Sequence, residues 1–115
     1  LYLSTMPNSS NPNFGIFTVN TSNPTDVTIT GVGQMSLDTD VNAMALDVAN
    51  NQVFLATSLV TGEVTSIDIT TPQTPTAKAT IDLPGTAVSL AFNGSNLYVA
   101  NNTVDQQLVV IGQGQ

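Results

Sequence analysis

The chain has 115 residues, the length of one domain, and its 41% apolar content is enough for a packed core although only 5% of the residues are aromatic. Its net charge of −7 and its single cation, Lys78, exclude the basic surface that binds nucleic acid or anionic lipid head groups. The absence of Cys excludes a disulfide framework and thiolate metal sites.

Short segments of β-forming residues follow one another along the chain, with turn-forming residues between them and no helical period. In chain order the predicted strands span 1–5, 16–20, 26–32, 41–48, 53–58, 64–68, 77–83, 87–94, 97–102 and 108–112. Pro72 and Pro75 end the sixth segment, because proline cannot donate to a β-ladder and restricts the residue before it. The sequence therefore predicts an all-β fold.

The strands recur as a repeat. "LYLST", "VFLATS" and "LYVANN" begin at residues 1, 53 and 97, and each is followed by a second related strand, "IFTVN", "VTSID" or "LVVIG". Two insertions of four residues, one within 6–15 and one near 31–40, bring the copies into register. A repeat of about 44 residues has the length of a four-stranded propeller blade.

We therefore divide a single β-propeller-like domain, 1–115, into repeats of approximately 1–52, 53–96 and 97–115, or about two and a half four-stranded antiparallel blades. The first group lacks its innermost strand and the last lacks its outermost strand. The chain also begins inside an apparent strand, which favours a piece of a longer protein. Because open sheet edges are rarely left exposed, we expect a section of a larger propeller or a subunit that completes its sheets by oligomerising.

Two turns support this repeat. Asn93 and Gly94 lie between two apolar runs and predict a hairpin turn, because both residue types accept positive φ. Asn50 and Asn51 predict the equivalent turn one repeat earlier. The stretch "GVGQ" at 31–34 precedes no helix and no Lys, so we interpret it as a strand-to-loop turn rather than a phosphate-binding loop.

The residue types that carry most catalysis are scarce. His and Cys are absent, no "GxSxG" occurs, and Lys78 lies among small polar residues as a solvated side chain. Asp47, Asp68 and Asp82 stand near strand ends in different repeats, where an Asp usually braces a turn rather than joining a hydrolytic pair. The sequence thus predicts no enzyme, no catalytic residue and no cofactor-binding residue.

One stretch resembles the start of a calcium loop. Asp38, Asp40 and Asn42 alternate as oxygen ligands do, but Ala43 and Ala49 replace the expected glycine and bidentate glutamate. We interpret the stretch as a polar loop that leads into the next strand and predict no metal site. Weak adventitious Ca²⁺ binding at 38–42 is the alternative.

The quoted segments also carry a family resemblance. "IFTVNTSNPTDVTIT" and "VTSIDITTPQTPTAKAT" resemble the LVIVD repeat of bacterial and archaeal surface β-propellers, which is related to the YVTN-type propellers. The resemblance covers nearly the whole chain and implies a β-propeller and a cell-surface location. Asp68 matches the final Asp of the family pattern, whereas Asn20 and Gly112 replace it in the other copies.

Two functions follow as expectations. The first is a non-enzymatic extracellular or cell-surface module for binding or adhesion, with the loops 6–14 and 33–40 contacting a protein or glycan. The second is a structural subunit of a surface filament, pilus or layer, in which copies assemble through open strand edges.

The 17 Thr, 12 Asn and 9 Ser give an uncharged polar surface that suits the extracellular space. No apolar run approaches a membrane span, so we expect no membrane insertion by this segment. Glycosylation is possible at four sequons, Asn8, Asn20, Asn93 and Asn101.

Overall fold

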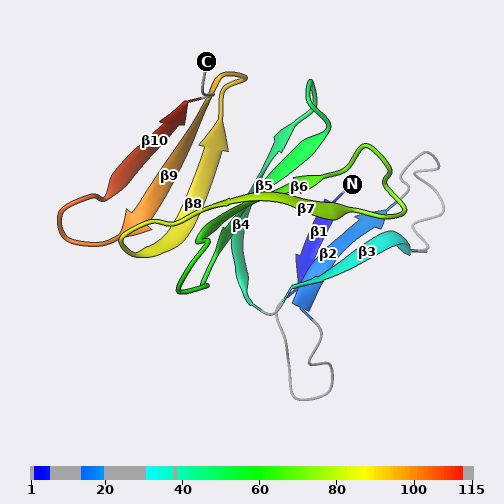
Figure 1. The fold of residues 1–115 in the computed structure, drawn as a ribbon, viewed down its shortest axis with the longest axis horizontal. Coiled ribbons are helices and arrows are strands. Elements are labelled where there is room, and N and C mark those ends of the chain that lie inside the picture. Colours follow the sequence, from blue (N-terminus) through cyan, green and yellow to red (C-terminus); the bar gives the residue numbers. More distant parts are fainter. Residues whose placement is uncertain (1, 6–13, 20–30, 38, 113–115) are drawn as a thin grey trace, which may run out of the picture.

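The structure, a computed structural model, describes residues 2–5, 14–19, 31–37 and 39–112, and these form ten strands and no helix (Figure 1). The strands are β1 Tyr2–Thr5, β2 Phe14–Val19, β3 Gly31–Leu37, β4 Val41–Asp47, β5 Gln52–Thr57, β6 Val64–Asp68, β7 Thr76–Ile81, β8 Thr86–Phe92, β9 Asn96–Asn102 and β10 Leu108–Gly112. Within this part of the chain, no segment forms a helix of the length and hydrophobicity needed to cross a membrane. The prediction of an all-β protein is confirmed.

The strands form three antiparallel sheets in which each strand pairs with its neighbour in sequence. The first sheet has the order β1-β2-β3, the middle sheet β4-β5-β6-β7 and the third sheet β8-β9-β10. The middle sheet lies between the other two, and the three sheets are inclined to one another (Figure 1). Sheets of three, four and three strands agree with the predicted grouping of the ten strands.

The middle sheet has apolar side chains on both faces. Val53, Leu55 and Ile67 are buried on one face, and partly buried side chains of the first sheet pack against them. On the other face, Ala56 and Val64 share a core with residues of the third sheet. Because successive side chains of a strand point to opposite faces, β5 supplies both cores, and the three sheets form one stack.

Direct contacts join the middle and third sheets. The rings of Phe54 on β5 and Phe92 on β8 are 5.2 Å apart between centroids and inclined by 50°. Nearby, the Asn42 side-chain amide on β4 donates to the carbonyl oxygen of Ala87 on β8 at 2.8 Å. Both contacts hold β8 against the middle sheet.

The predicted C-terminal end of the third strand is wrong. We expected a strand at 26–32 followed by a loop from Gly33 to Asp40, but β3 spans Gly31–Leu37 and pairs with β2. Residues 26–30 lie outside the described residues. Met35 and Leu37 alternate along β3 and pack against the core of the middle sheet, which fixes this register. The interpretation of "GVGQ" as a strand-to-loop turn is therefore also wrong.

The two asparagine turns form where they were predicted, with one difference. Asn51 takes a positive φ of 50°, and Gly94 takes 95°. Asn93 does not, because it stands at the first position of the turn. Its Oδ1 accepts the N–H groups of Ser95 and Asn96 at 3.0 and 2.8 Å, and its own N–H donates to the carbonyl oxygen of Asn96. Of the two residues, only Gly94 therefore adopts the positive φ that both residue types accept.

Candidate functional site: an apolar pocket beside β1

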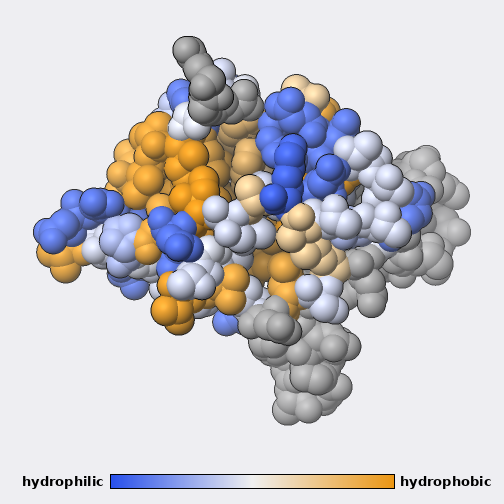
Figure 2. All heavy atoms as spheres, in the orientation of Figure 1, coloured by the Kyte–Doolittle hydropathy of each residue, from blue (hydrophilic) through white to orange (hydrophobic). Residues whose placement is uncertain are grey.

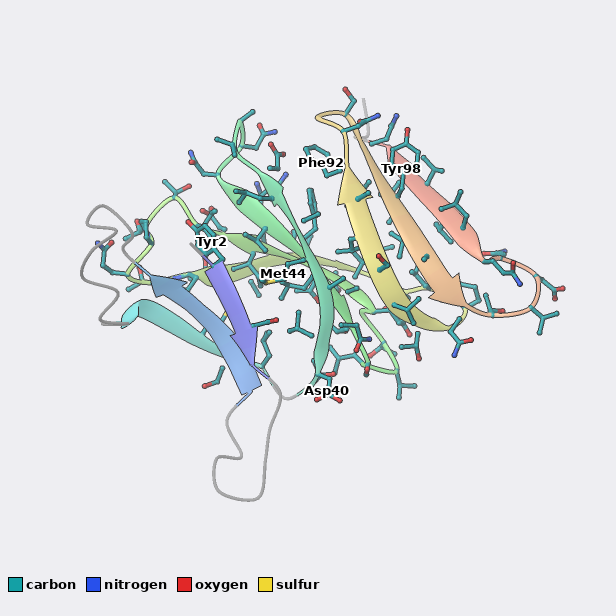
Figure 3. The ribbon with its side chains drawn as sticks, turned by 180° about the vertical axis from the view of Figure 1, so that it is seen from behind. Tyr2, Asp40, Met44, Phe92 and Tyr98 are labelled. Atoms are coloured by element: carbon teal, nitrogen blue, oxygen red, sulfur yellow. The ribbon has the colours of Figure 1, made fainter. Side chains whose placement is uncertain are left out.

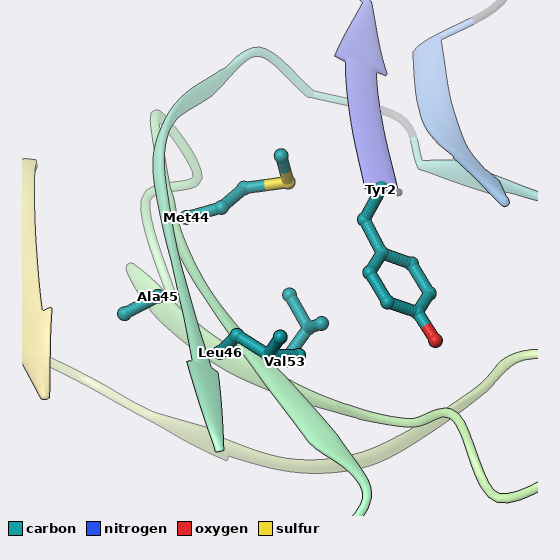
Figure 4. A pocket seen from close by; sticks show the side chains of 5 residues that line it. All are labelled: Tyr2, Met44, Ala45, Leu46 and Val53. Carbon is teal, nitrogen blue, oxygen red and sulfur yellow. The ribbon is translucent and has the colours of Figure 1, made fainter. Parts of the chain in front are cut away.

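A pocket of about 310 Å³ opens between the first and middle sheets (Figure 4). Five residues line it, Tyr2 of β1, Met44, Ala45 and Leu46 of β4, and Val53 of β5. The Tyr2 ring lies on one side, and the Met44, Leu46 and Val53 side chains lie across from it (Figure 4). Among these side chains the Tyr2 hydroxyl is the one polar group, so the pocket suits an apolar group.

Strand pairing places the lining residues. Leu46 pairs with Val53 across β4 and β5, and Met44 stands two residues before Leu46 on the same face. Tyr2 pairs with Thr18 of β2, so β1 approaches this face from the first sheet. Met44 and Tyr2 both pack against the core of the middle sheet (Figure 3). The pocket therefore lies where two sheets meet.

β1 is the edge strand of the first sheet. Its other side pairs with β2, and no strand of the described chain pairs with the edge that is left. An unpaired edge presents backbone N–H and C=O groups that accept a further strand. The pocket and the free edge of β1 are therefore neighbouring parts of one site.

The internal repeat shows which residues occupy the equivalent of the pocket between the middle and third sheets. In the aligned repeats Tyr2 corresponds to Phe54, and Leu46 corresponds to Phe92. Phe54 and Phe92 touch, because β8 packs on β4 and β5 of the middle sheet. Between the first and middle sheets, the residues corresponding to this pair line the pocket. The first sheet as described has no strand equivalent to β4, and the pocket lies where that strand would pack.

A second, more polar pocket of about 270 Å³ lies beside the β5–β6 loop. Its lining residues are Ser58, Leu59, Val60, Glu63, Leu83, Pro84, Gly85 and Thr86. Glu63 is buried, and its Oε2 accepts the backbone N–H of Leu83 at 2.8 Å. Close by, the Asp82 carboxylate accepts the N–H of Gly62. Both carboxylates therefore tie this loop to the segment after β7.

The predicted turn-bracing aspartates act as expected. Asp47 is buried and accepts hydrogen bonds from the side chains of Asn50 and Gln52, at 2.8 and 2.9 Å, and from the Asn50 backbone N–H. These bonds, the one from the Asn50 side chain foremost, lower the pKa of Asp47 against the opposing effect of desolvation. Asp68 accepts the N–H of Thr70 at 2.8 Å, and this bond lowers the pKa of Asp68. Lys78 is exposed on β7.

The stretch that resembles a calcium loop is used for packing. Asp38 lies outside the described residues. The Asn42 amide donates to Ala87 and, at 3.1 Å, to the hydroxyl of Ser58. Asp40 accepts the N–H of Ser58 through its backbone carbonyl. In the described part of the chain, no group of three or more His, Cys, Asp or Glu residues is arranged to hold a metal ion.

The predicted glycosylation sites and surface loops differ in their placement in the structure. Asn8, Asn20 and residues 6–13 of the first predicted loop lie outside the described residues. Asn93 is exposed in the β8–β9 turn, whereas Asn101 is buried with 4% of its surface exposed. A buried amide is not accessible for glycan attachment, so the sequon at Asn101 is not an acceptor in this fold. The second predicted loop, 33–40, belongs to β3 as far as Leu37.

Sequence reasoning did not identify the pocket residues or Glu63. Met44 and Leu46 were recognisable as apolar positions of a strand, but a sequence pattern does not reveal whether a neighbouring strand covers them. No family model, curated protein or solved structure matches the chain. The candidate site is therefore defined by its geometry.

Proposed function

We propose that the chain is a non-enzymatic binding or adhesion module of the β-propeller type, which receives an extended segment of a partner protein beside β1. The observation that carries this proposal is the apolar pocket at the free edge of β1. The partner segment adds a strand to the first sheet, and its backbone pairs with β1. One apolar side chain of that segment enters the pocket between Tyr2 and Met44.

The chemistry of the chain supports binding rather than catalysis. His and Cys are absent from the sequence, and Asp47, Asp68, Asp82 and Glu63 are engaged with backbone N–H groups. The resemblance to LVIVD and YVTN-type surface propellers and the uncharged polar composition support an extracellular or cell-surface location. Three stacked antiparallel sheets are compatible with a section of such a propeller.

A peptide of the chain's own sequence provides a defined probe for the site. The peptide TAVSLAF, residues 86–92, reproduces β8, which pairs with β9 as the partner segment would pair with β1. Titration into labelled protein, followed by nuclear magnetic resonance, is expected to shift the Met44 methyl and the Tyr2 ring signals. A scrambled peptide of the same composition is expected to leave them unchanged.

A matched pair of variants tests where the peptide binds. Leu46→Lys places a charge in the pocket wall and is expected to weaken binding of the peptide by about tenfold or more. Val48→Lys makes the same change just after β4, at a side chain that is 74% exposed, and is expected to have no effect. Equal weakening by both variants, or shifts confined to other sheets, would contradict the proposal.

The second candidate function is a structural subunit of a surface filament, pilus or layer. It is favoured by the outer edges of β1 and β10, which no strand among the described residues pairs with and which belong to the two end sheets of the stack. Copies joined through such edges form polymers that grow with concentration. Light scattering on the chain alone separates the two: the mass of a binding module levels off as the concentration rises, whereas the mass of an edge-joined subunit continues to grow.

A further inference from the structure

The third sheet has an apolar face that points away from the middle sheet. Val109 and Ile111 of β10 pack toward the middle sheet, so the alternating Leu108 and Val110 stand on the opposite face. Their side chains are 65% and 53% exposed. Hydrophobic residues gather at the left of the molecule, where the third sheet lies (Figure 2).

Strand register extends this face across the whole sheet. Val110 pairs with Tyr98 of β9, and Tyr98 pairs with Ala91 of β8. Leu108 pairs with Ala100 in the same way. We call these five residues, Ala91, Tyr98, Ala100, Leu108 and Val110, the end face. It contains no charged residue in a chain whose net charge is −7.

The internal repeat shows which face of the middle sheet corresponds to the end face. Its residues correspond to Ala45, Phe54, Ala56, Val64 and Ser66 of the middle sheet. Four of those residues, all but Ser66, belong to the core between the middle and third sheets. The equivalent face is therefore buried by another β-sheet within the same chain, and the end face has an apolar composition that suits burial in the same manner.

We propose that the end face binds the end face of a second copy, so that two chains form a closed dimer in which their third sheets pack face to face. Two uncharged apolar faces meet without bringing the carboxylates of two acidic chains into contact. The same patch serves both copies, as a two-fold interface requires. This inference goes beyond the proposed function and uses neither the pocket nor β1.

The alternative is that the first sheet of a second copy covers the end face, in a head-to-tail arrangement. In the chain's own interface, β8, the first strand of the covering sheet, contacts β4 and β5 of the equivalent face, and residues of β9 and β10 complete the core. The first sheet as described has no strand in the position of β8. A second copy's first sheet therefore does not reproduce the contact, whereas a complete end face offers an apolar surface along all three of its strands.

Sedimentation equilibrium on the chain over a wide concentration range tests the proposal. The mass is expected to rise from 11.9 kDa and to level off at twice that value, because a two-fold interface closes. A mass that stays at the monomer value contradicts the proposal, as does a mass that continues to grow. The latter result would instead indicate head-to-tail or edge-joined assembly.

Three variants with equal charge changes locate the interface. Val110→Asp and Leu108→Asp are expected to raise the dimer dissociation constant by about tenfold or more, because a carboxylate would be buried in the interface. Val60→Asp, in the β5–β6 loop, changes a valine that is 92% exposed and is expected to leave the constant unchanged. Circular dichroism establishes that each variant keeps its β-structure. Equal weakening by Val60→Asp, or no weakening by both end-face variants, would overturn the proposal.

Discussion

Phe54 of the middle sheet and Phe92 of the third sheet place their ring centroids 5.2 Å apart, with the ring planes inclined by 50°. This tilted geometry is favourable for aromatic pairs, because the positive edge of one ring approaches the negative face of the other. The two residues come from strands β5 and β8, so the contact connects two sheets rather than two strands of one sheet. Mutating this pair therefore tests how much the contact between the two sheets stabilises the fold.

We expect Phe54→Leu and Phe92→Leu each to lower the free energy of unfolding. The double variant is expected to lose about 0.5–1.5 kcal/mol less than the sum of the single losses, which is the range measured for aromatic pairs. Urea denaturation of the four proteins measures this coupling. As a control, Phe54→Leu combined with Val60→Ala is expected to be additive, because Val60 is an exposed loop residue. An additive result for the phenylalanine pair would show that the two sheets are held together elsewhere.

Gly33 of β3 lies against the backbone of the loop between β6 and β7. A Cβ at this position would overlap the carbonyl oxygen of Pro72 and lie 2.8 Å from the Cα of Gln73. Gly33→Ala must therefore displace backbone on one side or the other, and we expect it to cost about 1–3 kcal/mol of stability. Denaturation measures the loss, and hydrogen exchange of the β3 amides shows whether the first sheet separates.

Gly112→Ala is the control for that experiment. Gly112 is a strand residue whose added Cβ would meet only the Asn96 Oδ1 at 3.4 Å. Its stability is expected to change by no more than about 0.5 kcal/mol. If Gly33→Ala behaves like Gly112→Ala, the loop that contains Pro72 does not press against β3.

Gly33 shows why the bounds of β3 were harder to predict from the sequence than those of other strands. β6 and β10 were predicted with the observed bounds, because each is rich in β-branched residues and ends at a residue of low strand propensity, Asp68 or Gly112. The third strand was predicted to end at residue 32 instead of Leu37, because Gly31 and Gly33 have low strand propensity and tertiary contacts override it. Gly33 is required by the approach of Pro72, and Met35 and Leu37 are held by the core.

The candidate site was less accessible to prediction than the strands. Alternation along β4 identifies Met44 and Leu46 as one apolar face, but the pocket also needs Tyr2, which the fold brings from a different sheet. Asn101 shows the same limit in another form. Its sequence context marks a sequon, whereas its burial follows from the register that pairs it with Ala87 on β8.

Asp47 is expected to make the stability of the chain depend on acid pH. Its pKa is lowered in the folded state by hydrogen bonds from Asn50 and Gln52, so the unfolded chain binds this proton more tightly. The stabilisation is present above the unfolded pKa of about 3.9 and is lost as the pH falls through the lower folded pKa. Asp68 contributes in the same direction.

Asp47→Asn removes this contribution, because its amide nitrogen would face the donors of Asn50 or Gln52. We expect the variant to be less stable than the parent at neutral pH and the difference to shrink as the pH falls below about 4. Thermal melting at a series of pH values measures both effects. Asp105→Asn, at an exposed position in the β9–β10 loop, is the charge-matched control. A stability difference that is the same at every pH would show that the Asp47 carboxylate is not the group responsible.

Asn101 and Thr57 occupy equivalent positions on β9 and β5, and their backbone N–H groups donate to equivalent carbonyl oxygens, those of Gln107 and Glu63. The Thr57 hydroxyl donates to the carbonyl oxygen of Gly62 at 3.2 Å and accepts the N–H of Leu59 at 3.3 Å. The Asn101 side chain is just as buried, but neither its Nδ2 nor its Oδ1 has a partner among the described residues. Burying such a group without hydrogen bonds costs about 1–3 kcal/mol.

We therefore expect Asn101→Thr to raise the free energy of unfolding by about 1 kcal/mol or more, because a smaller side chain with one hydroxyl replaces two unpaired polar atoms. The reverse change, Thr57→Asn, is expected to lower it, since the hydrogen bonds to Gly62 and Leu59 are lost. Asn102→Thr, at the exposed next position of β9, is the control and is expected to be close to neutral. Urea denaturation of all three variants measures these differences. A loss of stability in Asn101→Thr would mean that the buried amide is paired in solution, by water or by a bound ligand, and has a role that a hydroxyl does not fill.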